Sequence, residues 1–101
     1  MLLFNKMRLL GRHLLQPLKD KDVKARLQLE SWESEVEDEQ WQTPLDLKRK
    51  YQKASIICGK NVIFNICGNR YRLWVKVEYK NGIVLIKDVG THKEYEKWNI
   101  D

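Results

Sequence analysis

The chain has 101 residues, of which 43% are hydrophobic and 33% charged, and its net charge is +5. This length suits one domain with one core, so residues 1–101 are predicted to form a single domain, and the apolar content excludes a disordered chain. The two cysteines match no metal or redox spacing, which favours a reducing, cytoplasmic setting. Charged residues interrupt the apolar N-terminal segment, which excludes a signal-peptide core and a membrane span.

The N-terminal third predicts one short strand and one long helix. We treat residues 1–6 as a candidate N-terminal extension and residues 7–11 as a candidate edge strand. Pro17 should interrupt any helix that begins near Arg12. From Val23 to about Glu39, apolar residues recur at helical spacing, which predicts an amphipathic helix. Two acids are available as its N-cap, Asp20 and Asp22.

A second, shorter helix is predicted from a capping signal. Thr43 is followed by Pro44, which suits the first position of a helix, and Asp46 places an acid in the first turn. One face of this helix should carry the apolar residues Leu47, Tyr51 and Ala54.

Charge is unevenly distributed along the chain. Six acids lie between Glu30 and Glu39 with no base among them, so the rest of the chain is strongly basic. One side of the molecule is therefore expected to be positive, which suits a polyanionic partner. The alternative is that these acids simply solubilise one helix.

After Gly59 the apolar period changes from 3.6 to 2, which predicts an antiparallel meander. Strands are expected at 61–66, 69–79 and 83–89, the first with a partly polar outer face. Cys67 to Asn69 should form the first turn, and Asn81-Gly82 a type I′ hairpin. Because Ile83 to Ile86 are all apolar, the last strand should be covered on both faces. The fold class is α+β: N-terminal helices packed on a small antiparallel sheet of about three strands plus the edge strand, with a short C-terminal helix.

The strand at 69–79 carries candidate nucleic-acid ligands on its outward face. Arg70, Arg72 and Lys76 can contact phosphates, and the ring of Trp74 can stack on a base. Charged outward faces are also common on solvated sheets, so a plain solvated strand is the alternative.

The end of the last strand carries a second set of candidates. Thr91 and Glu94 form a capping-box pattern, which predicts a helix with His92 in its first turn and Tyr95 on the same face. Such a helix start can hold a phosphate oxygen and favours neutral imidazole, hence a base. The alternative for His92 is a surface or capping histidine.

RNA cleavage without a metal requires a base, an acid and fixed positive charge at the phosphate. His92, Tyr95 and Arg72 can supply these three groups, with the assignment of base and acid left open. No cofactor is required, because the attacking hydroxyl belongs to the substrate. Asn65 and Asn69 can orient the substrate, or they are turn residues that suit their local backbone.

The motifs FNI-x-GN-x-YRL and GTHKEY resemble the signature of HigB-type toxins, members of the RelE-like superfamily of bacterial mRNA interferases. The resemblance implies a RelE-like fold and an endoribonuclease that cuts mRNA on the ribosome. It also implies a cytoplasmic protein that is held inactive, in a hetero-oligomer, by a HigA-like antitoxin with a helix-turn-helix fold. The alternative is a non-catalytic basic RNA-binding or regulatory module with the same fold.

Matching positions carry the family's functional residues onto this chain. The resemblance places catalytic roles at His92, Tyr95, Arg72 and Asn69. Further substrate contacts are expected from six residues: Arg70, Trp74, Lys76, Asn65, Lys60 and Lys93. The chain departs from the family pattern at Cys67, Trp74 and Glu96. An acidic antitoxin segment is expected to cover the basic sheet face, while the acids of residues 30–39 face solvent or antitoxin cations.

Overall fold

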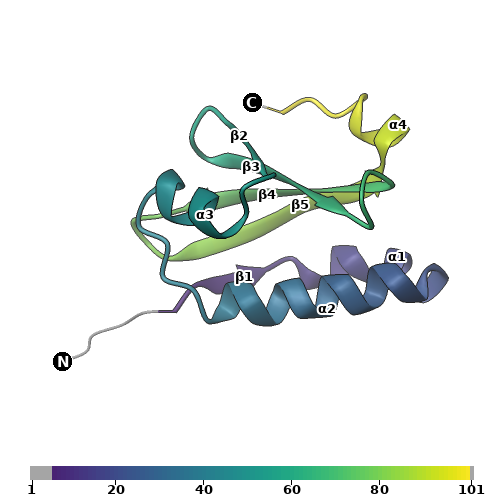
Figure 1. The fold of residues 1–101 in the computed structure, drawn as a ribbon, viewed down its shortest axis with the longest axis horizontal. Helices are drawn as coiled ribbons and strands as arrows, with labels where there is room; N and C mark the ends of the chain where they lie inside the picture. Colours follow the sequence, from purple (N-terminus) through teal and green to yellow (C-terminus); the bar gives the residue numbers. More distant parts are fainter. Residues whose placement is uncertain (1–5, 101) are drawn as a thin grey trace.

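The computed structural model describes residues 6–100, which form a five-stranded mixed sheet with helices on both sides (Figure 1). The strands are β1 (Arg8–Leu10), β2 (Ser55–Ile57), β3 (Asn61–Ile66), β4 (Tyr71–Glu78) and β5 (Ile83–Thr91). The helices are the 3-10 helix η1 (Arg12–Leu15), then α1 (Gln16–Lys21), α2 (Val23–Glu37), α3 (Pro44–Lys50) and α4 (His92–Tyr95). The predicted α+β class is confirmed, whereas the proposed extension at residues 1–6 lies outside the described residues except for Lys6.

The sheet order is β1-β5-β4-β3-β2, with β1 parallel to β5 and the other pairs antiparallel. The meander and the N-terminal edge strand are therefore confirmed. Strand β2 was not predicted, because its three residues follow Ala54 directly and are too few to show alternation. It adds a second edge beside β3.

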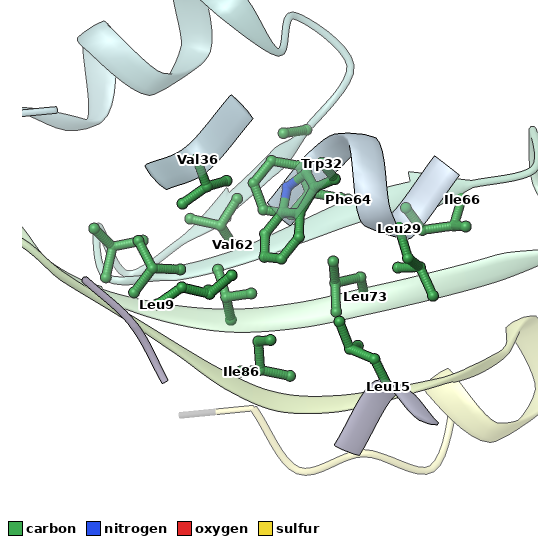
Figure 2. Close-up of a cluster of buried hydrophobic side chains, with 14 of the residues drawn as sticks. Leu9, Leu15, Leu29, Trp32, Val36, Val62, Phe64, Ile66, Leu73 and Ile86 are labelled. Atoms are coloured by element: carbon green, nitrogen blue, oxygen red, sulfur yellow. The ribbon is translucent and has the colours of Figure 1, made fainter. Parts of the chain in front are cut away.

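Helices α1 and α2 cover one face of the sheet, and α4 lies on the other (Figure 1). The core forms between α2 and the inward side chains of the strands, where Leu29 and Trp32 meet Phe64 and Leu73 (Figure 2). Trp32 packs edge-to-face on Phe64 with ring centroids 5.4 Å apart. Among residues 6–100, no helix has the length and apolar character needed to cross a membrane.

Asp22 is the N-cap of α2 and joins this helix to the sheet. Its carboxylate accepts hydrogen bonds from Ala25 N at 3.1 Å and from the Tyr71 hydroxyl at 2.7 Å. The Tyr71 bond is the main reason why the pKa of Asp22 lies below its ordinary value. The start of α2 is thus fixed against the start of β4.

The other predicted helix boundaries are close to those observed. The helix begun at Arg12 ends at Leu15, and Pro17 stands in the first turn of α1, where no N–H is required. Thr43 and Asp46 form the capping box of α3. That helix ends at Lys50, so Tyr51, its C-cap, and Ala54 lie beyond it rather than on its face.

Two details of the predicted sheet are wrong. Of the Asn81-Gly82 pair only Gly82 has a positive φ, whereas a type I′ turn requires both. Strand β5 is not covered on both faces: Leu85 is 36% exposed, because α1 and α2 pack on one side only. The outer face of β3 is partly polar as predicted, because it carries Asn61 and Asn65, although Asn61 and Ile63 are buried.

The acids of residues 30–39 do not form a free negative face. Glu33 is buried and pairs with Lys19 at 2.5 Å and with Arg12 at 3.2 Å. Further along, Asp38 pairs with Lys6 and Glu39 with Lys50. Bases from distant parts of the chain therefore neutralise much of this segment.

Candidate active site

The register of β3, β4 and β5 places three residues of the predicted site region in one row. Asn65 pairs with Arg72, and Arg72 pairs with Gly90. Directly opposed residues of a sheet project to the same face, which here is the face opposite α1 and α2. Arg72 is thus the centre of the row, at the end of the sheet where β5 passes into α4.

Gly90 allows α4 to fold back closely on this row. A Cβ at Gly90 would lie 2.7 Å from Glu94 Oε1 and 3.1 Å from Glu94 Cβ, so a larger residue would push the helix away. Thr91 N–H donates to Glu94 Oε1 at 2.7 Å, and Glu94 N–H donates to Thr91 Oγ1 at 3.2 Å. The predicted capping box is confirmed, and its Thr91 bond lowers the pKa of Glu94.

Arg72 and Tyr95 are in direct contact. The guanidinium carbon of Arg72 lies 5.7 Å from the centre of the Tyr95 ring, which is a cation–π arrangement. Arg72 Nη1 also donates to the carbonyl of Asn69 at 2.9 Å and to that of Tyr71 at 3.3 Å. These bonds hold the guanidinium between the turn that precedes β4 and the helix that follows β5.

His92 extends the same cluster toward solvent. Its ring centroid is 6.0 Å from that of Tyr95, as the helical spacing predicted. Its Nε2 lies 3.3 Å from a carboxylate oxygen of Glu96, one turn further along. Glu96 was noted only as a departure from the family pattern, although a spacing of four residues on a helix indicates a partner for the imidazole.

Asn69 enters the cluster through its backbone. It belongs to the turn in which Cys67 and Gly68 have φ of 53° and 66°, and Arg70 N–H donates to Cys67 O at 3.2 Å. The carbonyl of Asn69 faces Arg72, while its side chain is exposed. Both the turn role and a role in holding Arg72 are therefore present.

The other predicted cations are spread over the molecule. Lys76 pairs in register with Asn61, four residues from Arg72 along β4, or about 13 Å. Lys60 lies at that same far end, 3.9 Å from Glu78. Arg70 turns toward α2, where it lies 3.6 Å from Asp22, so it does not share the outward face of Arg72. Lys93 is exposed on α4 beside His92.

Trp74 is covered by the C-terminal segment, not by α1 or α2. Its ring lies 5.9 Å from that of Trp98, and Trp98 packs edge-to-face on Tyr95 at 5.7 Å. The indole N–H of Trp74 donates to Asn61 Oδ1 at 2.9 Å. Trp98 was missed as a candidate, although it follows Tyr95 at helical spacing.

A hollow of about 560 Å³ opens beside the row, between β3 and the segment after α3. Asn65 and Asn69 border it, together with residues that were not predicted: Gln28, Tyr51, Gln52 and Lys53. Tyr51 donates to Glu35 at 2.6 Å, and burial is the first reason why its pKa is raised. The amides and the lysine give this hollow a polar, cationic rim.

The geometry brings together an imidazole, a phenol and a guanidinium on an open face of the sheet. Within residues 6–100, His, Cys, Asp and Glu side chains do not gather in groups of three or more that suit a metal ion. The cluster can accept a proton, donate a proton and stabilise negative charge.

Comparison with protein families gives one finding. A family model described as HigB_toxin, RelE-like toxic component of a toxin-antitoxin system, matches residues 25–98. That range contains every residue of the cluster described above. A search of the curated proteins found no match.

Proposed function

We propose that this chain, which belongs to the HigB family of RelE-like toxins, inhibits translation as an endoribonuclease that cleaves mRNA. The observation that carries the proposal is the contact between Arg72 and Tyr95, with His92 beside them. These residues come from different elements and meet only through the register of β4 and β5. Residues 1–101 then act as a single toxin domain.

The reaction is a transfer within the RNA. The ribose 2′-oxygen attacks phosphorus, a bond forms between them, and the bond from phosphorus to the 5′-oxygen breaks. One protein group takes the 2′-hydroxyl proton and another gives a proton to the leaving oxygen, which yields a 2′,3′-cyclic phosphate and a 5′-hydroxyl. His92 and Tyr95 fill these two roles, in either order.

Arg72 stabilises the charge that develops on the phosphate. A guanidinium already held by the carbonyls of Asn69 and Tyr71 needs little reorganisation as the reaction proceeds, which is the condition for electrostatic catalysis. Its remaining N–H groups are the donors for the phosphate oxygens. Asn65 and the side chain of Asn69 border the same row and are assigned to substrate orientation.

The remaining cations are assigned to phosphates outside the reacting one. Lys93 is beside His92, and Arg70 is on the adjoining turn. Lys60 and Lys76 lie at the far end of β3 and β4, so they serve nucleotides away from the scissile bond. Apart from Arg70, which turns toward α2, these cations follow the charge of an RNA backbone across one side of the molecule.

The openness of the cluster supports action on the ribosome. The side chain of His92 is 53% exposed, whereas proton transfer and charge stabilisation are more effective where water is excluded. The protein alone does not enclose the site. We assign that enclosure to the ribosome, which presents the mRNA and covers the exposed side of the cluster.

The cognate antitoxin is proposed to be a HigA-like protein with a helix-turn-helix fold that forms a hetero-oligomer with this toxin. An acidic segment of the antitoxin is assigned to the face that carries Arg72 and Lys76. The acids of residues 30–39 contribute less to this contact than the sequence suggests, because Lys19, Arg12 and Lys50 already pair with them.

Induction of the protein in growing bacteria, with 5′ ends mapped on cellular mRNA, tests the proposal. Wild-type protein should arrest growth and create new 5′-hydroxyl ends, and co-expressed antitoxin should prevent both. His92→Ala should abolish cleavage without a loss of thermal stability. The chain provides a matched control, because its other histidine, His13, is exposed on η1 and His13→Ala should remain fully toxic.

The same exposure that requires a covering partner also favours a second candidate, a basic RNA-binding module without catalysis. That module would bind RNA and leave it intact. RNA binding with no new 5′ ends, and equal behaviour of wild-type protein and His92→Ala, would support it and overturn the nuclease proposal.

A further inference from the structure

Helix α4 carries two of the proposed catalytic groups but has little to hold it in place. It has four residues and none of them is buried. A single turn of helix is not stable by its own hydrogen bonds, so its position depends on contacts outside it. The capping box orders its backbone, but the direction of the Tyr95 ring must be set by other side chains.

Those contacts are aromatic. Trp98 packs edge-to-face on Tyr95, with an interplanar angle of 88°, and its ring also lies 5.9 Å from that of Trp74. Backbone bonds continue the turn, since Trp98 N–H donates to Tyr95 O at 3.0 Å. The ring of Tyr95 thus contacts both Trp98 and the guanidinium of Arg72.

Trp74 is itself held by two further side chains. Asn61, which is 1% exposed, accepts the indole N–H at 2.9 Å. Lys87 is the extra residue of a β-bulge, because Trp74 pairs with Asp88 and Val75 with Ile86. Its ammonium lies 5.7 Å from the centre of the Trp74 ring. A continuous set of contacts therefore runs from a buried amide through two indoles to Tyr95.

We propose that Trp98 and Trp74 are positioning residues that hold Tyr95 over Arg72, so that the C-terminal segment sets the geometry of the reaction. The inference rests on the nuclease function proposed above. It gives Trp74 a role different from direct stacking on an RNA base: its contacts with Trp98, Asn61 and Lys87 already use the ring and its N–H. A displaced Tyr95 slows the chemical step more than it weakens RNA binding.

The first test separates rate from binding. Cleavage of a defined mRNA in a purified translation system gives kcat and KM for wild-type protein, Trp98→Ala, Trp98→Phe and Asn99→Ala. Trp98→Ala should lower kcat by about 100-fold with little change in KM, and Trp98→Phe should recover most of the loss. Asn99→Ala, an exposed neighbour in the same segment, should behave as wild type.

The second test reports on Tyr95 without any RNA. Protein labelled with fluorotyrosine has four fluorine NMR signals, one for each tyrosine, and the loss of one in Tyr95→Phe assigns the signal of interest. Trp98→Ala should move that signal toward the position of free fluorotyrosine and leave the other three in place. Trp74→Ala should move the same signal.

An unmoved Tyr95 signal in Trp98→Ala, or a rise in KM at constant kcat, would overturn the inference. The second result would identify Trp98 as a direct contact for an RNA base. If wild-type protein cuts no RNA, the proposed function fails, whereas the NMR comparison still decides whether Trp98 holds Tyr95.

Discussion

Replacement of Tyr95 by phenylalanine removes one hydroxyl from the proposed site and leaves its packing intact. The ring contacts of Tyr95, with Arg72 at 5.7 Å and with Trp98 at 5.7 Å, use the face and edge that phenylalanine also has. Because no buried hydrogen bond or core contact is lost, the free energy of unfolding should change by no more than about 0.5 kcal/mol.

The effect on cleavage should be much larger. A positioned general acid or base contributes roughly 10²–10⁴ in rate, which corresponds to about 2.7–5.4 kcal/mol of transition-state stabilisation. Tyr95→Phe should therefore fold normally, bind the antitoxin normally and fail to arrest growth. The gap between a small stability change and a large rate change is the expected sign of a group that acts in the reaction.

The assay combines three measurements on purified wild-type and Tyr95→Phe protein: the thermal midpoint, affinity for the antitoxin, and the rate of mRNA cleavage in a translation system. A variant that folds and still cleaves at more than a third of the wild-type rate would refute a proton-transfer role for this hydroxyl. A variant that unfolds would show that Tyr95 has a structural role that its surface position does not indicate.

Three further predictions concern charge. Arg72→Lys keeps the charge but loses the planar guanidinium, in which Nη1 contacts two carbonyls and the other N–H groups are left for the phosphate. The cleavage rate should therefore fall on the order of 10²-fold, and wild-type rates would contradict this role. Lys76→Glu should weaken antitoxin binding, most strongly at low salt, whereas Lys24→Glu on α2 should leave antitoxin binding unchanged. Equal antitoxin affinities of the two variants would exclude the assigned face. The carboxyls of Asp22 and Glu94 have pKa values below their ordinary 3.8 and 4.5 in the folded protein. In acid the unfolded chain therefore binds more protons than the folded chain, so the contribution of these carboxylates to stability is lost as the pH falls below about 4. Thermal midpoints measured from pH 7 to pH 3 should decline at the acidic end, and a flat profile would contradict the cap contacts.

Elements with a strong local signal were predictable from the sequence. The alternation in β4 fixed which of its residues are buried, and the capping boxes of α3 and α4 marked both helix starts. The cluster of Arg72, His92 and Tyr95 was also predicted, since strand alternation puts Arg72 on the outer face and the short helix follows the neighbouring strand.

Features that depend on distant parts of the chain were not predictable in this way. Leu85 lies in an apolar run yet is exposed, because α1 and α2 pack on one side of β5 only (Figure 1), which the run itself does not indicate. Asn61 appears polar and outward in the alternation, but Trp74 and its neighbours bury it. The sequence of α2 suggests a negative face, but Arg12 and Lys19, the basic partners of Glu33, come from the preceding segment.

The topology of the sheet explains why one row can bring the proposed groups together. Strands β3 and β4 are joined by the turn at Asn69, and β5 ends at the same end of the sheet because it runs antiparallel to β4. A turn and a strand end that are about twenty residues apart in sequence therefore meet at one end of the sheet, and α4 begins there. Gly90 lets that helix lie against the row. A substitution that shifts β5 by one residue would reverse the side-chain directions of β5 and carry His92 and Tyr95 away from Arg72. The bulge at Lys87 sets this register, so the position of Trp74 and the position of α4 depend on the same irregularity in β5.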